Sequence, residues 1–339
     1  MAKEIVTPTP EMTALLVKSG SAQNREESLA AMHQLAVALE MPLRKGVLFG
    51  DITGGIFETI KMAPGASPEF PLDFIAPGTE KDYAAYTIPN HGRIPERNVE
   101  GDYVMVPTYE VGSSIDWLLK YARDARWDIV ARAMQVLEAS FIKKVNDDAW
   151  HALLAAGVDR NIVVYDSLAA VGQFTKRLVS LMKTIMRRNG GGNSTSINRG
   201  KLTDLYFSPE ALEDIRDWGL DQIDEFTRRE IFTAEDGVIN RVFSVNLHDI
   251  DELGVGQEYQ NFFTTDLSGQ MGGSGGTADE EMVLGLDLRN RDSFVMPVRQ
   301  EVQVFEDDQM HRQRRAGVYA WGEHGFGVLD NRRILLGSF

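Results

Sequence analysis

Apolar residues recur at helical spacing in three parts of this sequence. In residues 24–39 they repeat every three or four positions, and Glu26 and Glu27 stand where a first helical turn favours negative charge. Residues 174–188 show a second amphipathic pattern, which stops at an Asn-Gly-Gly-Gly sequence typical of a helix end. The sequence therefore predicts a helix over each of these two segments.

The third helical pattern is the longest and covers residues 113–156, which contain neither glycine nor proline. The apolar positions of residues 130–149 form one stripe at spacings of three and four. Ser113 and Asp116 fit the start of a capping box, so one helix of roughly 45–60 Å is expected over most of the run. Two helices with a break between residues 121 and 126 fit the first part equally well.

Alternation of apolar and polar residues predicts strands elsewhere in the chain. The expected strands cover residues 56–62, 83–88, 102–106, 202–207, 282–288, 294–305 and 312–321, with a strand or hairpin at 238–247. Ser208, Pro209 and Glu210 predict a helix start, with serine at the N-cap and proline at the first helical position. The order is a long helix, then mixed helices and strands, then long strands, without alternating βαβ units, so the pattern predicts an α+β fold.

The first fifty residues are expected to form a semi-detached arm. Pro8 and Pro10 interrupt the beginning of the arm. Pro42 is expected to end the helix predicted over residues 24–39, because proline lacks the amide hydrogen that a helix interior needs. Four glycines between residues 46 and 55 then make the chain loose.

Residues 64–95 hold six of the twelve prolines. Proline removes a hydrogen-bond donor and fixes φ, so little regular structure is expected there. The same region carries Phe70, Leu72, Phe74 and Ile75, although long structureless loops are rare in compact domains. We therefore predict an extended excursion whose apolar side chains rest on another part of the chain or on a neighbouring copy.

Composition excludes several classes of protein. The chain of 339 residues is 43% hydrophobic and 25% charged, as in folded soluble proteins. It contains no cysteine, which excludes disulfide scaffolds, thiolate zinc sites, iron–sulfur clusters and a cysteine nucleophile. No run of about 18 apolar residues predicts a membrane span, and the beginning lacks the pattern of a secretory signal.

The net charge of −15 argues against a protein that grips a nucleic-acid backbone, because such proteins need a basic surface or stripe. The basic clusters are short: Arg187–Arg188, Arg228–Arg229 and Arg312–Arg315. We interpret them as solvated faces of helices and strands.

No pattern of residues predicts a catalytic, cofactor-binding or metal-binding site. No two of the six histidines stand three or four positions apart, so a helical metal pair is not predicted. Residues 272–276 satisfy the letters of a nucleophile elbow but lack its strand and helix, and predict a flexible loop. The fifty carboxylates leave a paired acid–base site open, although no particular pair stands out.

The order and spacing of these segments resemble the major capsid proteins of tailed bacteriophages with the Hong Kong 97-type fold. The arm and the proline-rich excursion come first, followed by the helix WDIVARAMQVLEASFIKKVNDDAWHALLA at 127–155. The segment LTDLYFSPEALEDIRDW at 202–218 is similar to the strand, turn and helix of the family's axial domain. Residues 283–330 are similar to its late strands.

The resemblance implies a fold with an N-terminal arm, an extended loop, a long spine helix, a peripheral domain and an axial domain. The implied boundaries are 1–49 for the arm, 50–111 for the extended loop, 112–156 and 299–324 for the peripheral domain with the spine helix and long strands, and 157–298 and 325–339 for the axial domain. The extended loop would lie across a neighbouring subunit, where Phe70, Phe74 and Ile75 would be buried.

The resemblance also implies a structural protein without enzymatic activity or cofactors. Its copies would form pentamers and hexamers that tile an icosahedral phage head around double-stranded DNA, without sequence-specific binding and without a membrane. The head would be assembled in the host bacterial cytoplasm with a portal. Only about fifty residues precede the extended loop, so a separate scaffolding protein is predicted. Lys61 and Lys81 do not match the family's cross-linking pattern, so no catalytic residue is carried over.

Three other classes remain as alternatives. The first is the shell of a bacterial nanocompartment, an encapsulin-like protein that shares the fold and encloses enzymes. The second is a cytoplasmic acidic enzyme that uses a carboxylate pair, which predicts a defined apolar pocket. The third is an adaptor or tail component of a phage, which would form a ring instead of a closed shell.

Overall fold

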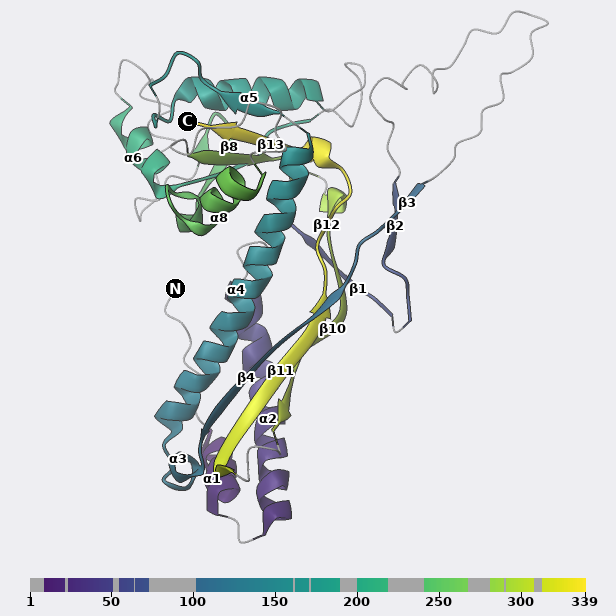
Figure 1. The fold of residues 1–339 in the computed structure, drawn as a ribbon, viewed down its shortest axis with the longest axis vertical. Coiled ribbons are helices and arrows are strands. Elements are labelled where there is room, and N and C mark those ends of the chain that lie inside the picture. Colours follow the sequence, from purple (N-terminus) through teal and green to yellow (C-terminus); the bar gives the residue numbers. More distant parts are fainter. Residues whose placement is uncertain are drawn as a thin grey trace, which may run out of the picture. The chain divides into compact units, whose positions relative to one another are not determined.

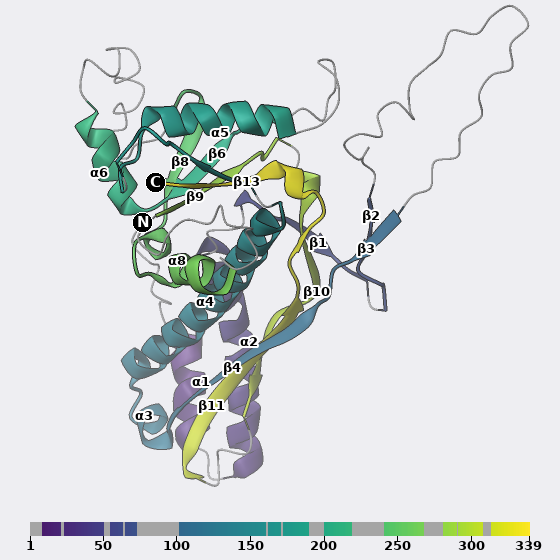
Figure 2. The same cartoon turned by 45° about the horizontal axis from the view of Figure 1, so that its top comes forward.

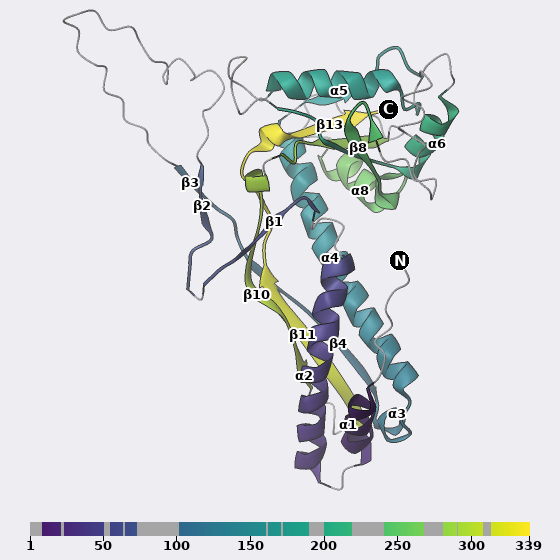
Figure 3. The same cartoon turned by 180° about the vertical axis from the view of Figure 1, so that it is seen from behind.

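The computed structural model describes residues 9–21, 24–50, 55–63, 65–72, 102–160, 162–170, 172–189, 200–218, 241–267, 281–289, 291–307 and 313–339. The chain divides into two compact units. Unit 1 consists of Met1–Pro68, Met105–Ala149 and Val295–Gly327, and unit 2 of Glu69–Val104, Trp150–Phe294 and Val328–Phe339. Figures 1, 2 and 3 show the elements of both units from three directions.

Unit 1 is built from a sheet and helices. Its elements are α1 (Pro10–Ser21), α2 (Arg25–Gly50), β1 (Glu58–Lys61), β4 (Tyr109–Leu118), α3 (Leu119–Arg123), the first part of α4 (Trp127–Asp159), β10 (Phe294–Glu306) and β11 (Arg315–His324). The strands lie in the order β1-β10-β11-β4, with β1 parallel to β10 and the other pairs antiparallel. Strands β11 and β4 pair without interruption from Arg315 opposite Leu118 to His324 opposite Tyr109.

One face of this sheet is buried under the helices of unit 1. Along β11 the alternate residues Ala316, Val318 and Ala320 are buried, as the two-residue period of a strand requires. They belong to one cluster with apolar residues of α1, α2, α3 and α4, including Leu16 and Phe141. The core of unit 1 therefore lies between the sheet and the four helices.

Unit 2 contains a second sheet. Its elements are the end of α4, β5 (Val163–Tyr165), α5 (Lys176–Asn189), β6 (Asp204–Phe207), α6 (Pro209–Asp217), β7 (Arg241–Val242), β8 (Val245–Asp249), α8 (Glu258–Asn261), β9 (Met282–Leu286) and β13 (Ile334–Ser338). The strands lie in the order β5-β13-β9-β6-β8-β7. Two further strands, β2 (Glu69–Leu72) and β3 (Asp102–Met105), pair only with each other. The short strand β12 (Gly327–Val328) stands at the boundary of the units.

The sheet of unit 2 is buried on both faces, so its central strands β6, β9 and β13 contain only buried residues. Leu205 and Phe207 of β6 belong to a cluster with α5 and α6. Helix α5 runs along the sheet, and α6 lies at one end of it (Figures 1 and 3). Tyr206 points to the other face, where its ring meets Trp150 of α4 with centroids 5.4 Å apart. A strand that is buried on both faces reads as a continuous apolar run.

Most of the predicted elements are confirmed. Helices α2 and α5 and strands β1, β3, β6, β9, β10 and β11 lie where the patterns predict them. The strand or hairpin expected at 238–247 is the hairpin of β7 and β8, which extends to Asp249. Ser208 caps α6 by accepting a hydrogen bond from the backbone N of Ala211. The expected strand at 83–88 and the expected flexible loop at 272–276 lie outside the described residues.

Two predictions about the arm are wrong. Pro10 does not interrupt the beginning, because it is the first residue of α1, where a missing amide hydrogen costs nothing. The side chain of Thr9 caps this helix by accepting from the backbone N of Met12 at 3.2 Å. Pro42 does not end α2, which continues to Gly50. Beyond the proline, Leu43 is buried in the core of unit 1, and this burial offsets the lost helical hydrogen bond.

The long helix begins later than its pattern suggests. Residues 113–118 belong to β4, so Ser113 and Asp116 do not start a helix. The register of β11 requires this segment as its neighbour, and Trp117 is buried as a strand residue. The alternative of two helices is confirmed, because α3 and α4 are separated at residues 124–126, where Ala125 has φ of 52°. Helix α4 then continues through Gly157 to Asp159.

Candidate assembly interface

The ribbon of β2 and β3 carries one of the three residues for which an inter-subunit contact is expected. Phe70 lies in β2 and is half-buried, whereas Phe74 and Ile75 lie outside the described residues. On the other strand, Tyr103 and Met105 are 66% and 63% exposed. As alternate residues of one strand, they share a face. The ribbon therefore presents large apolar side chains on its surface.

The base of this ribbon is tied down by a backbone hydrogen bond. The N of Val106 donates to the O of Pro68 at 3.0 Å, and Pro68 is buried. On the preceding strand β1, Lys61 forms an ion pair with Glu301 of β10, while Lys81 lies outside the described residues. The absence of covalent linkage through these lysines stays a prediction.

A buried ionic network lies at the ends of β9 and β13 in unit 2. Asp287 is fully buried and accepts hydrogen bonds from Arg333 at 2.6 Å and Arg289 at 2.7 Å. The backbone N of Lys201 donates to the same carboxylate at 2.9 Å. Burial raises the pKa of Asp287, but these donors and the charge of Arg333 outweigh burial and hold the pKa below its ordinary value. This network joins chain segments and leaves no free base.

Asp204 and His248 form an acid–base pair on the neighbouring strands β6 and β8. Oδ1 of Asp204 lies 2.9 Å from Nε2 of His248 and accepts from Asn246 at 3.0 Å. Burial raises the pKa of Asp204, but hydrogen bonds from His248, Thr203 and Asn246 lower it below its ordinary value overall. The imidazole also stacks on Tyr206, with ring centroids 4.6 Å apart. All these contacts hold the carboxylate in place within the sheet.

Glu281 precedes β9 and is buried beside the start of α6. The hydroxyl of Ser208 donates to its carboxylate, and its backbone forms two hydrogen bonds with Phe339 at 3.1 and 3.0 Å. Burial raises the pKa of Glu281, and the charges of Glu210 and Asp214 raise it further, against the opposing effect of Ser208. The backbone of Glu281 thus joins the start of β9 to the C-terminal residue, and its buried carboxyl group is costly to ionise.

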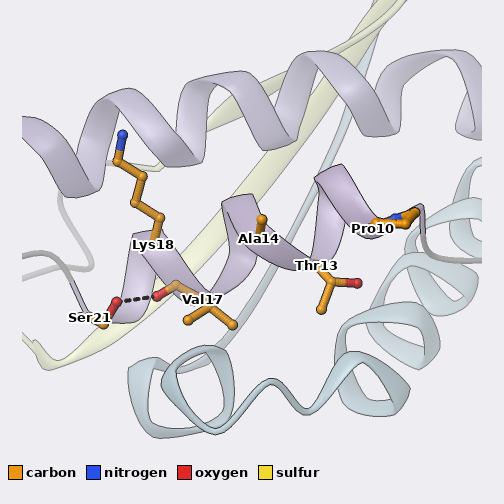
Figure 4. A pocket seen from close by; sticks show the side chains of 6 residues that line it. All are labelled: Pro10, Thr13, Ala14, Val17, Lys18 and Ser21. Atoms are coloured by element: carbon orange, nitrogen blue, oxygen red, sulfur yellow. Dashed lines mark hydrogen bonds between the residues drawn. The ribbon is translucent and has the colours of Figure 1, made fainter.

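A shallow hollow of about 760 Å³ lies along α1 in unit 1 (Figure 4). It is lined by Pro10, Thr13, Ala14, Val17, Lys18 and Ser21. The hydroxyl of Ser21 donates to the O of Val17 at 2.7 Å, and Lys18 is the only charged residue among the described residues of the lining. The described lining thus does not supply the pair of titratable groups that acid–base chemistry uses.

A second hollow, of about 610 Å³, lies beside α5 in unit 2 and gathers positive charge. Arg187 lines it together with Lys183, Lys201 and Arg289. The pair Arg187–Arg188 predicts only a solvated face of a helix, so this cluster is not evident from the sequence. The signal that could have identified it is the composition of α5, which carries five basic residues and no acidic one in an acidic chain.

Among the described residues, no group of three or more histidine, aspartate or glutamate side chains is placed to hold a metal ion. Within the same residues, no helix is both long enough and apolar enough to cross a membrane. In the part of the chain that the structure describes, the geometry therefore supplies ion networks and exposed surfaces, without a cluster of metal-binding side chains.

Comparison with known proteins connects this fold to phage capsids. No model of a known protein family matches the sequence, and no curated protein resembles it in sequence. Among solved structures, a chain of Microbacterium phage Oxtober96 is similar over 86% of this chain and 90% of its own, with 10% identity and a TM-score of 0.57. The Cyanophage Pam1 capsid is similar over 84% of this chain and 88% of its own, with 15% identity and a TM-score of 0.54.

A third similar structure is the acidic stable capsid of Helicobacter pylori bacteriophage KHP30, with 10% identity, a TM-score of 0.54, and coverage of 84% of this chain and 89% of that one. The likeness extends over nearly the whole length of both chains in each comparison. The chain therefore shares the fold of these phage capsid structures, and the resemblance noted in the sequence is confirmed at the level of the fold.

Proposed function

We propose that this chain is the major capsid protein of a tailed bacteriophage. Its copies assemble into pentamers and hexamers that form an icosahedral head around double-stranded DNA. The observation that supports this proposal is the likeness to capsid structures over 84–86% of this chain and about nine-tenths of theirs. A likeness of that extent includes both units, so it is not limited to a small shared module.

In this proposal, the two units correspond to the two domains of a capsid subunit. The helices and long strands of unit 1 would form the peripheral domain, and the sheet of unit 2 would form the axial domain. The β2–β3 ribbon belongs to the extended loop, which would lie across a neighbouring subunit. Phe70, Phe74 and Ile75 would be buried there, and the exposed Tyr103 and Met105 give the ribbon further apolar surface to cover.

The chain acts as a structural subunit of the shell, without catalytic activity or cofactor. We expect it to work with a separate scaffolding protein and a portal, to assemble in the bacterial cytoplasm and to reside in the virion shell. A subunit of net charge −15 would enclose DNA without holding most of its length tightly.

Electron microscopy of the purified chain tests the proposal. The chain, expressed alone and with a candidate scaffolding protein, is analysed by size-exclusion chromatography and negative staining. Closed icosahedral shells are expected, and a stable monomer or an open ring under both conditions would contradict the proposal. Shells that package protein instead of DNA in the native host would identify a nanocompartment. Boiling the particles in detergent should release a single band of 37.8 kDa, whereas a ladder of multiples would reveal covalent links.

A variant of the ribbon tests the proposed contact. Phe70→Asp should leave a folded subunit that no longer forms shells, because a carboxylate cannot be desolvated in an apolar interface. The control is Val37→Asp, which introduces the same charge on α2 at a position that is 54% exposed. Circular dichroism checks the fold of both variants. Normal shells from Phe70→Asp would refute the contact while leaving the capsid function intact.

A further inference from the structure

Helix α5 is a basic element in an acidic chain. Its fourteen residues include five lysines and arginines and no aspartate or glutamate, whereas the whole chain carries a net charge of −15. The buried apolar residues Leu178, Val179, Met182 and Met186 face the sheet of unit 2. The helix therefore keeps its apolar stripe inside and directs its basic residues outward.

The outer face of α5 forms one wall of the hollow of about 610 Å³, which we call the basic groove. Ser180, Lys183, Thr184 and Arg187 line it at spacings of three and four residues, which place them on one face of the helix. Lys201 and Arg289 line it from other segments of unit 2. None of the described residues that line the groove is acidic. The charged groups among them are all hydrogen-bond donors.

The positive charge of the groove is only partly neutralised within unit 2. Arg187 and Lys201 are exposed, and neither side chain forms an ion pair with the residues that the structure describes. Arg289 binds Asp287, but this buried carboxylate is shared with Arg333. Arg333 also lies 3.9 Å from Asp330. Among the described residues, the buried carboxylate of Asp287 is thus shared between two guanidinium groups, and Arg187 and Lys201 add unpaired positive charge to the groove.

A hairpin turn is fastened to the same helix. Phe243 and Ser244 connect β7 to β8 with φ of 49° and 64°, a left-handed conformation that is unfavourable for residues with a Cβ atom. Nζ of Lys183 donates to the O of Phe243 at 2.6 Å, so the turn is held against α5. Phe243 lines the groove and is 38% exposed. The turn at Phe243 therefore forms the part of the groove wall that the Lys183 hydrogen bond holds beside α5.

We propose that the basic groove binds the phosphates of duplex DNA. Guanidinium, ammonium and hydroxyl groups are the donors that proteins use to contact phosphate oxygens. From Ser180 to Arg187 the helix rises roughly 10 Å at 1.5 Å per residue, so this face is long enough to reach more than one phosphate of a strand. The partner is named as DNA on the strength of the proposed function, whereas the polyanion chemistry follows from the groove itself.

Each groove would bind weakly, because the rest of the acidic subunit repels DNA. Many copies in a shell would still order the outermost DNA layer through multiple contacts. A carboxylate-rich segment of a second copy would be the competing occupant. DNA is favoured because the groove brings cations of the helix together with Lys201 and Arg289, and a duplex offers neighbouring phosphates to several of them at once.

Fluorescence anisotropy with a labelled duplex of random sequence tests this proposal on the unassembled full-length chain. The variant is Arg187→Glu with Lys201→Glu. Its matched control is Lys120→Glu with Arg126→Glu, which changes the net charge equally at two exposed positions of unit 1. At low salt, the groove variant should bind roughly tenfold or more weakly, and the slope of log affinity against log salt should fall by about two. The control should keep the slope of the wild type.

Arg187→Lys with Lys201→Arg preserves the charge and should keep both affinity and slope, which separates lost phosphate contacts from misfolding. Equal losses in the groove variant and the control, or binding of polyglutamate without binding of duplex DNA, would overturn the proposal. Electron microscopy of the wild type separates this result from the proposed function, because a wild-type chain that forms shells but does not bind duplex DNA refutes the groove alone.

Discussion

The two units of this molecule use charged residues in different ways. In unit 1, the ion pairs lie at the surface: the side chains of Arg315 and Asp116 are 45% and 29% exposed. In unit 2, Arg333 and Asp287 form an ion pair with side chains that are 8% and 0% exposed. A surface pair contributes about 0–1 kcal/mol, whereas a buried charge that loses its partner is strongly destabilising.

The two units therefore differ in the interactions that stabilise them. Unit 1 buries the apolar stripes of four helices on one face of its sheet, and its charges can change with little effect. Unit 2 buries its sheet on both faces, and the charged side chains of Asp287 and Arg333 are buried at the ends of its strands β9 and β13. Its stability should therefore respond to single charges and to pH far more than that of unit 1.

Removal of one buried charge should give the largest effect. Asp287→Ala leaves Arg333 without its main carboxylate, and the free energy of unfolding should fall by about 3–5 kcal/mol. Asp116→Ala, which removes the partner of Arg315 in unit 1, should cost about 0–1 kcal/mol. Urea unfolding of unassembled subunits measures both values, and hydrogen exchange assigns the loss to unit 2.

The same pair has a pH dependence of known sign. Because the pKa of Asp287 is lowered in the folded chain, its stabilisation is present above the unfolded pKa and is lost as the pH falls through the folded pKa. Similar losses in Asp287→Ala and Asp116→Ala would contradict the difference between the units.

A close backbone approach in unit 1 should give the next largest effect. A Cβ atom on Gly325 would lie 2.2 Å from the O of Pro107, so Gly325→Ala must displace one of two chain segments at the end of β11. We expect a loss of about 1–3 kcal/mol, typical of overpacking. The control is Gly55→Ala, where a Cβ atom would meet nothing within 4 Å. Thermal unfolding of the two variants should separate them by several degrees, and equal midpoints would show that the approach is looser than described.

Periodicity in the sequence was sufficient to predict the elements whose neighbours do not alter their local preference. Helix α5 and the segment from β6 to α6 follow directly from their patterns, because propensity, capping and burial all favour the same conformation. The order of such elements also carried the resemblance to capsid proteins, which the fold confirms.

Residues 113–118 show what the sequence could not predict. They lack glycine and proline and join a helical run without a break, but they form β4 because β11 offers a full row of hydrogen bonds. This tertiary pairing overrides the local pattern. Similarly, no local signal in α5 revealed that Lys201 and Arg289, far apart in the chain, would line the groove beside Arg187.

The helix caps compare the same tripeptide type in both units. Thr9-Pro10-Glu11 begins α1 in unit 1 and Ser208-Pro209-Glu210 begins α6 in unit 2. Only the second was recognised from the sequence, because the first stands near the beginning among other prolines. Both are capped by a side-chain oxygen that accepts from the third residue of the helix.

Removal of each cap should have an unequal cost. Thr9→Ala should destabilise by about 1 kcal/mol, as an N-cap does. Ser208→Ala should cost roughly 2 kcal/mol, because Ser208 is buried and also donates to Glu281. Hydrogen exchange of α1 and α6 measures the two effects separately. A greater loss at Thr9 would mean that burial does not amplify the cap in unit 2.

Glu281 should give the smallest effect, and one of opposite sign to that of Asp287. Burial raises the pKa of Glu281, so the folded chain holds the proton more tightly than the unfolded chain. The carboxyl group therefore lowers the free energy of unfolding as the pH rises above its pKa in the unfolded chain. Glu281→Gln removes the charge and keeps an oxygen for Ser208, so it should match the wild type at about pH 4 and be slightly more stable at about pH 8. Glu213→Gln makes the same charge change at an exposed position of α6 and should show no such dependence. Urea midpoints at the two pH values measure the differences, and a Glu281→Gln variant that is less stable than wild type at the higher pH would mean that the ionised carboxylate stabilises unit 2.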